Sequence, residues 1–204
     1  MESPTEKRPA RRKDAEENRA RIVAAARAVY ASAGFDAPFD AIARHAGVGR
    51  ATLYRNFPDR YALGAAIVED DLCELEALAH EHGDRPDAFM KLLSAIVERH
   101  TETHALVPAL LRGPGEHALQ ALVPRVTRLL TVPLQRARAA GLVRDDLTLA
   151  DVIDVLAMLS AVLADDGSGR ARDRRMARAL ELLIHGLVPR APVGSPIGPN
   201  SPRM

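Results

Sequence analysis

Two short segments with helical spacing of apolar residues, 38–46 and 50–57, are joined by only Gly47, Val48 and Gly49. A turn this short packs two helices closely against each other, and glycine supplies the positive φ with which the chain leaves the first helix. The valine between the glycines is placed to fill the space under both helices. Two helices joined in this way form a helix-turn-helix, whose second helix has the size to enter the major groove of DNA.

Both segments have clear ends. Pro38 is expected to open the first helix, because its fixed φ suits the first helical position, and Gly47 ends it. The second helix turns Leu53 and Phe57 inward at i and i+4 and ends before Pro58. This leaves its other side chains available to DNA, namely Arg50, Ala51, Thr52, Tyr54, Arg55 and Asn56.

These side chains have the chemistry that DNA contacts require. Arg50 can reach guanine O6 and N7 as a bidentate fork, and Ala51 and the Thr52 methyl group can touch thymine. The hydroxyl groups of Thr52 and Tyr54 can bond phosphate oxygens. Arg60, at the start of the next helix, can hold another phosphate.

Helical periodicity continues along the chain, and no sustained period-2 pattern bounded by hairpin turns appears. We therefore predict an all-α fold, in which an N-terminal three-helix helix-turn-helix domain is linked by a long fourth helix to a C-terminal helical bundle. Pro124 and Pro133 should break or kink a helix over 116–140. The other helices are expected at about 19–33, 60–80 with Asp59 as its cap, 86–104, 106–111, from the Thr148 cap onward, and 171–188.

The two ends of the chain differ from the rest. Residues 1–17 are basic, hold almost no large apolar side chain and are expected to form a disordered arm; 191–204 repeat Pro and Gly and are expected to be disordered too. Between them we expect a DNA-binding domain over 18–64 and a second domain over 65–190. Residues 1–60 carry 12 Lys and Arg against 8 Asp and Glu, although the whole chain has a net charge of only +1. A basic front favours a polyanionic partner at that end.

Several classes of protein are disfavoured. Cys73 is the single cysteine, which excludes an intrachain disulfide and favours the cytoplasm. No apolar run is long enough to span a bilayer, and the charged start does not resemble a signal peptide. Motifs of serine hydrolases, zinc proteases and di-iron bundles are missing, so we predict neither an enzyme nor a cofactor or metal site. His100 and His104, at i and i+4, can be a metal pair, part of a ligand pocket or, more simply, core or surface histidines.

The C-terminal half has two apolar sets of its own. A mostly apolar ligand pocket is expected at Phe89, Leu93, Ile96, His100, Leu122 and Val126. The helix that follows Thr148 has little polar face, and with the last helix it suggests a four-helix dimer interface. That predicted interface consists of Val152, Val155, Leu156, Leu159, Leu163, Leu180, Leu183, Ile184 and Leu187.

The segment GFDAPFDAIARHAGVGRATLYRNFPDRYAL, residues 34–63, resembles the N-terminal domain of the TetR family of bacterial transcriptional regulators. The resemblance covers about 19–69, and 136–152 and 180–190 are similar to the family in outline. It implies that Thr52 and Tyr54 contact the DNA backbone, that Gly49 and Arg50 lie against base edges, and that Arg60 contacts a phosphate. Gly49 stands where many members have a capping serine, and Pro38 replaces a Ser or Thr cap.

The resemblance implies a ligand-responsive transcriptional regulator, a repressor that binds a palindromic double-stranded operator as a homodimer and is released by a small-molecule effector. The operator half-sites would then lie about one helical turn, or a multiple, apart. The alternative is a small-molecule-binding helical protein without DNA function. That alternative leaves the pattern of residues 34–63 unexplained.

Overall fold

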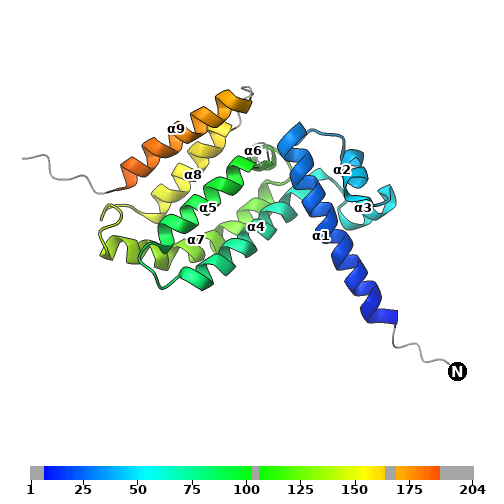
Figure 1. Cartoon of the computed structure of the whole chain (residues 1–204), viewed down its shortest axis with the longest axis horizontal. Helices are drawn as coiled ribbons and strands as arrows, with labels where there is room; N and C mark the ends of the chain where they lie inside the picture. Colours follow the sequence, from blue (N-terminus) through cyan, green and yellow to red (C-terminus); the bar gives the residue numbers. More distant parts are fainter. Residues whose placement is uncertain (1–6, 103–105, 164–168, 189–204) are drawn as a thin grey trace, which may run out of the picture.

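The computed structural model describes residues 7–102, 106–163 and 169–188, and within these ranges the regular elements are all helices, so the all-α prediction is confirmed. Figure 1 shows α1, α2 and α3 at one end and the bundle of the remaining helices at the other. The helices are α1 (Lys7–Ala33), α2 (Phe39–Ala46), α3 (Arg50–Asn56), α4 (Arg60–His82), α5 (Ala88–Glu102), α6 (Leu106–Leu111), α7 (Glu116–Ala139), α8 (Leu149–Leu163) and α9 (Gly169–Leu187). No described helix is long and apolar enough to cross a membrane.

Helix α1 starts earlier than expected, because it is already helical at Lys7 instead of Arg19. The prediction of a disordered arm is therefore wrong from Lys7 onward, and residues 1–6 lie outside the described residues. Pro9 falls in the first turn, where a missing N–H leaves no hydrogen bond unmade. Lys13 and Glu17 form an i,i+4 ion pair on the extension.

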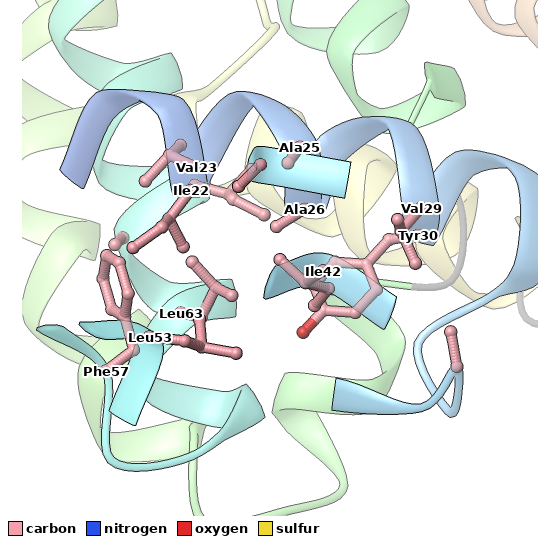
Figure 2. Packing of buried hydrophobic residues seen from close by; sticks show 14 of the residues in the cluster. Ile22, Val23, Ala25, Ala26, Val29, Tyr30, Ile42, Leu53, Phe57 and Leu63 are labelled. Carbon is pink, nitrogen blue, oxygen red and sulfur yellow. The ribbon is translucent and has the colours of Figure 1, made fainter. Parts of the chain in front are cut away.

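The first three helices share one core with the start of α4 (Figure 2). Ile22 and Ala26 of α1, Ile42 of α2 and Leu53 of α3 are each fully buried there. Phe57, the C-cap residue of α3, is 2% exposed and packs in the same core. Because α2 and α3 are each shorter than three turns, this shared core, more than helix propensity, holds them in place.

Helix α4 joins the two halves of the protein. Asp59 caps it as predicted, since its carboxylate accepts a hydrogen bond of 2.8 Å from the amide of Ala62. Leu63 of its first turns lies in the core of the N-terminal domain, whereas Leu72 lies in the core of the C-terminal bundle. Cys73, on the same helix, is exposed.

The C-terminal bundle packs α4, α5, α7 and α8 around a second core. Helix α7 continues through Pro124 and Pro133, so of the expected break or kink the break is not present. Pro133 is buried, and its packing compensates for the backbone hydrogen bond that proline removes. The capping box before α8 is confirmed: the Thr148 amide donates to Asp151 at 2.7 Å and the Asp151 amide donates to the Thr148 hydroxyl at 3.2 Å. The tail predicted over 191–204, and His104, lie outside the described residues.

Candidate nucleic-acid interface and effector cavity

The turn between α2 and α3 has the geometry that its two glycines predicted. Gly47 has φ +63° and ends α2 in the left-handed conformation, and its amide donates to carbonyls of the last turn. Pro38 precedes α2 as its N-cap instead of being its first residue. Val48 is partly buried against the core of the N-terminal domain. Arg21 of α1 donates to the carbonyl oxygens of Ala46 at 2.8 Å and Gly47 at 3.0 Å, a positioning contact that the sequence reading missed.

The two glycines should respond differently to substitution. Gly47→Ala places a Cβ in the left-handed region and should lower the free energy of unfolding by about 1 kcal/mol. Gly49→Ala is the matched control, because Gly49 has φ −71° and an added Cβ meets nothing within 4 Å. Urea unfolding of the two variants measures the difference. Equal stability of both would mean that the turn does not need its left-handed residue.

Helix α3 presents a nearly continuous exposed surface to solvent. Gly49, Arg50, Ala51 and Arg55 are exposed, and the Tyr54 side chain is 45% exposed. Thr52 and Asn56 are partly buried. All seven predicted DNA contacts at 49–56 therefore share one accessible helix, while Leu53 and Phe57 hold its opposite face in the core.

Several of these side chains are held in place before any DNA arrives. Arg50 forms an ion pair of 3.0 Å with Asp40 of α2, yet its side chain is 71% exposed. The Tyr54 ring meets the Phe39 ring edge-on at 5.3 Å between centroids. Arg55 donates to the Thr52 hydroxyl at 3.1 Å. Ordering in advance lowers the entropy lost on binding.

Arg60 lies apart from this set. Its guanidinium donates to the carbonyl of Phe35 at 3.1 Å and pairs with Asp36 at 3.3 Å. It also lies over the Phe35 ring, 5.8 Å from the centroid. In this structure Arg60 fastens the loop between α1 and α2, and a phosphate contact would require it to leave these partners.

A cavity of about 120 Å³ lies among the helices of the C-terminal bundle. Four of the six residues predicted to line a ligand pocket surround it, namely Ile96, His100, Leu122 and Val126. The other two do not: Phe89 is fully buried in the core, and Leu93 lines a separate cavity of about 160 Å³ between α5, α8 and α9. The rest of the wall of this cavity is mostly apolar and includes Val68, Leu72, Leu75, Val107, Leu129 and Leu156.

One end of this cavity is polar, which the sequence reading missed. Asp71 of α4, only 8% exposed, and Arg99 of α5 are part of its wall. Arg27 of α1 donates to Asp71 Oδ1 at 2.5 Å and to the carbonyl of Ile67 at 3.2 Å. Arg99 Nε lies 3.6 Å from the same carboxylate oxygen. Burial raises the pKa of Asp71, and the two guanidinium groups act in the opposite direction.

His100, on the same wall, links stability to pH. Burial lowers its pKa, and its hydrogen bond to the backbone of Ile96 opposes that shift only in part. Below the pKa of about 6.5 of an unfolded histidine, the unfolded chain binds a proton that the native protein resists, so stability falls as the pH drops until the folded pKa is passed. His100→Gln should therefore lose less thermal stability between pH 7 and pH 5 than the wild type. His80→Gln, at an exposed histidine, should match the wild type.

The predicted dimer interface is partly wrong. Val152, Leu159 and Leu187 are 1%, 2% and 6% exposed and belong to the core of a single chain. Val155, Leu156 and Leu183 are partly buried against the same chain. The side chains of Leu163, Leu180 and Ile184 lie outside the described part of the structure. The apolar residues do recur at helical spacing, but those described lie on the faces of α8 and α9 that pack within one chain and not on a face left for a partner.

Two family models match this arrangement. The model of "Bacterial regulatory proteins, tetR family" matches residues 22–67, which hold the C-terminal part of α1, all of α2 and α3 and the start of α4. The model of "Transcriptional regulator SbtR-like, C-terminal domain" matches residues 85–189, which hold α5 to α9. No curated protein matches the chain.

Solved structures give the same assignment. A TetR transcription regulatory protein from Mycobacterium vanbaalenii is 28% identical, with 87% of this chain and 98% of the other covered and a TM-score of 0.62. The TetR transcriptional regulator SCO0520 from Streptomyces coelicolor is 28% identical, with 85% and 99% covered and a TM-score of 0.58. A γ-butyrolactone receptor described as ArpA-like is 25% identical, with 86% and 90% covered and a TM-score of 0.54. With family models matched across both halves, this protein belongs to the TetR family of transcriptional regulators.

Proposed function

We propose that this regulator is a repressor that binds a palindromic operator as a homodimer and leaves it when a small molecule occupies the cavity among α4, α5 and α7. The exposed surface of α3 is the observation that supports DNA binding. Its Arg50, Thr52 and Tyr54 combine base-reading and phosphate-binding chemistry on one helix that a buried core supports from behind.

The homodimer is supported by apolar side chains that a single chain leaves uncovered. Met158 of α8 is 54% exposed and Leu182 of α9 is 57% exposed. These residues replace Val152, Leu159 and Leu187 as the proposed contacts between subunits, because a two-fold axis through α8 and α9 would bury both. A dimer places two copies of α3 on the DNA, which explains why a palindromic site is expected.

The effector half of the proposal depends on the cavity. Its wall is apolar except at Asp71, Arg99 and His100, which suits a small, mostly apolar molecule with a polar group. The similar structure described as a γ-butyrolactone receptor is named for a small lactone. We propose a small, mostly apolar ligand of comparable size for the present chain. A ligand of that size can shift the regulator only if it binds one conformation more tightly than the other.

Selection of binding sites from a pool of random DNA tests the proposal. We expect enrichment of a two-fold symmetric sequence, binding that weakens steeply with salt, and a complex with the mass of two chains per site. Leu182→Arg is expected to give monomers in analytical ultracentrifugation and to lose the symmetric site. If no sequence is enriched while the protein still binds small molecules, the alternative of a ligand-binding protein without DNA function is correct.

A further inference from the structure

The polar end of the cavity is electrically balanced. Arg27 and Arg99 contribute two positive charges. Asp71 on the wall and the more exposed Glu74 outside it contribute two negative charges, and Glu74 does so through an ion pair of 2.7 Å with Arg99. The fifth ionisable group, His100, is neutral near pH 7 because its pKa is lowered by burial. A charged ligand would thus meet no uncompensated opposite charge and would lose its own hydration.

Asp71 nevertheless has hydrogen-bonding capacity left. Both arginines approach its Oδ1, Arg27 at 2.5 Å and Arg99 at 3.6 Å. Its Oδ2 accepts no hydrogen bond from any residue that the structure describes. A carboxylate oxygen can accept two hydrogen bonds, and Oδ2 is not one of the fully buried atoms that lack a partner, so a small donor can reach it. A ligand that donates one hydrogen bond would satisfy Oδ2.

The same carboxylate also connects the two domains. Arg27 belongs to α1, whose apolar side chains form part of the N-terminal core that supports α3, whereas Asp71 lies on the wall of the cavity. The Arg27 side chain is 27% exposed and that of Asp71 is 12% exposed, so this pair is screened little by solvent. A donor on Oδ2 draws on the charge of the carboxylate that Arg27 holds through Oδ1, and so weakens the Arg27–Asp71 ion pair.

We propose that the cavity selects an uncharged, ring-sized apolar molecule with one hydroxyl or N–H donor, that this donor binds Asp71 at Oδ2, and that the weakened Arg27–Asp71 ion pair transmits binding to the DNA-binding domain. This inference deepens the proposed function and rests on it for the DNA response alone. A cavity of about 120 Å³ is comparable to the cavities of about 150 Å³ that hold one benzene molecule, which sets the size of the ligand.

Four probes with the same ring test the selectivity on the wild-type protein: phenol, benzene, benzoate and benzylammonium. We expect phenol to bind about tenfold more tightly than benzene in NMR titrations, as a hydrogen bond to a charged acceptor allows. Benzoate and benzylammonium should bind more weakly than phenol. Tighter binding of either ion, or equal binding of phenol and benzene, would overturn the proposal without any variant being made.

Two variants test the roles of Asp71 and Arg27. Asp71→Asn should reduce the preference for phenol over benzene at least severalfold, whereas Asp70→Asn, the same charge change one residue away, should keep it. Arg27→Gln should still bind phenol, but phenol should no longer lower its operator affinity. An unchanged preference in Asp71→Asn, or a retained DNA response in Arg27→Gln, would contradict the proposal. The phenol preference is measured without DNA, so it stands or falls independently of the proposed repressor function.

Discussion

Leu53→Ala is expected to lower the free energy of unfolding by about 3 kcal/mol and to abolish DNA binding. Leu53 is fully buried where α1, α2 and α3 meet (Figure 2). Helix α3 has only seven residues, so its position depends on this buried side chain. Removing its side chain leaves a cavity that a short helix can fill only by shifting. Urea unfolding and a DNA-binding assay on the same preparations measure the two effects.

Leu111→Ala is the matched control for this change. Leu111 lies in α6 and is 47% exposed, so the same substitution should change stability by only about 0.5 kcal/mol. If both variants were equally stable, the shared core would not be what positions α3. A stable Leu53→Ala variant with intact DNA binding would lead to the same conclusion.

Asp71→Ala is expected to cost about 3 kcal/mol, because it leaves the partly buried guanidinium groups of Arg27 and Arg99 without their shared carboxylate. The double variant Arg27→Met with Asp71→Leu should recover part of that loss, since apolar side chains of similar size can replace a buried ion pair. Asp70→Ala is the control on the same helix. Thermal unfolding of the four proteins forms the comparison.

A comparison of Asp71→Ala with Asp70→Ala can contradict the stabilising role of the Arg27–Asp71 ion pair. If Asp71→Ala destabilised the protein no more than Asp70→Ala, the ion pair between α1 and α4 would not contribute to stability. The double variant then should show no recovery either. Both results would also remove the physical link through which a ligand at Asp71 is proposed to reach the DNA-binding domain.

The N-terminal domain could be predicted closely because its signals are local. Gly47 had to leave α2 with positive φ, Asp59 had to cap α4, and Leu53 with Phe57 had to face inward. Each of these features depends on residues within four positions along the chain. Helix spacing also brought Ile96 and His100 to the cavity wall, since they lie one turn apart on α5.

What the sequence could not predict depends on contacts between distant segments. Asp71 and Arg27 are 44 residues apart, and a single aspartate on a helix normally suggests a solvent-exposed side chain. Helix α8 is apolar on most sides, so its pattern did not separate the face that packs within the chain from the face left for a partner. That is why Val152 and Leu159 were assigned to the dimer interface although both are buried in one chain.

Operator affinity of Arg50→Ala tests the central claim, that α3 reads DNA, most directly. Its side chain is 71% exposed and its ion pair with Asp40 contributes little to stability, so the variant should stay folded. We expect it to bind the selected operator about tenfold more weakly and to discriminate less against scrambled DNA. Arg128→Ala, the same change at an exposed position of α7, should bind as the wild type does. Unchanged operator affinity and selectivity in Arg50→Ala would contradict the assignment of α3 as the recognition helix.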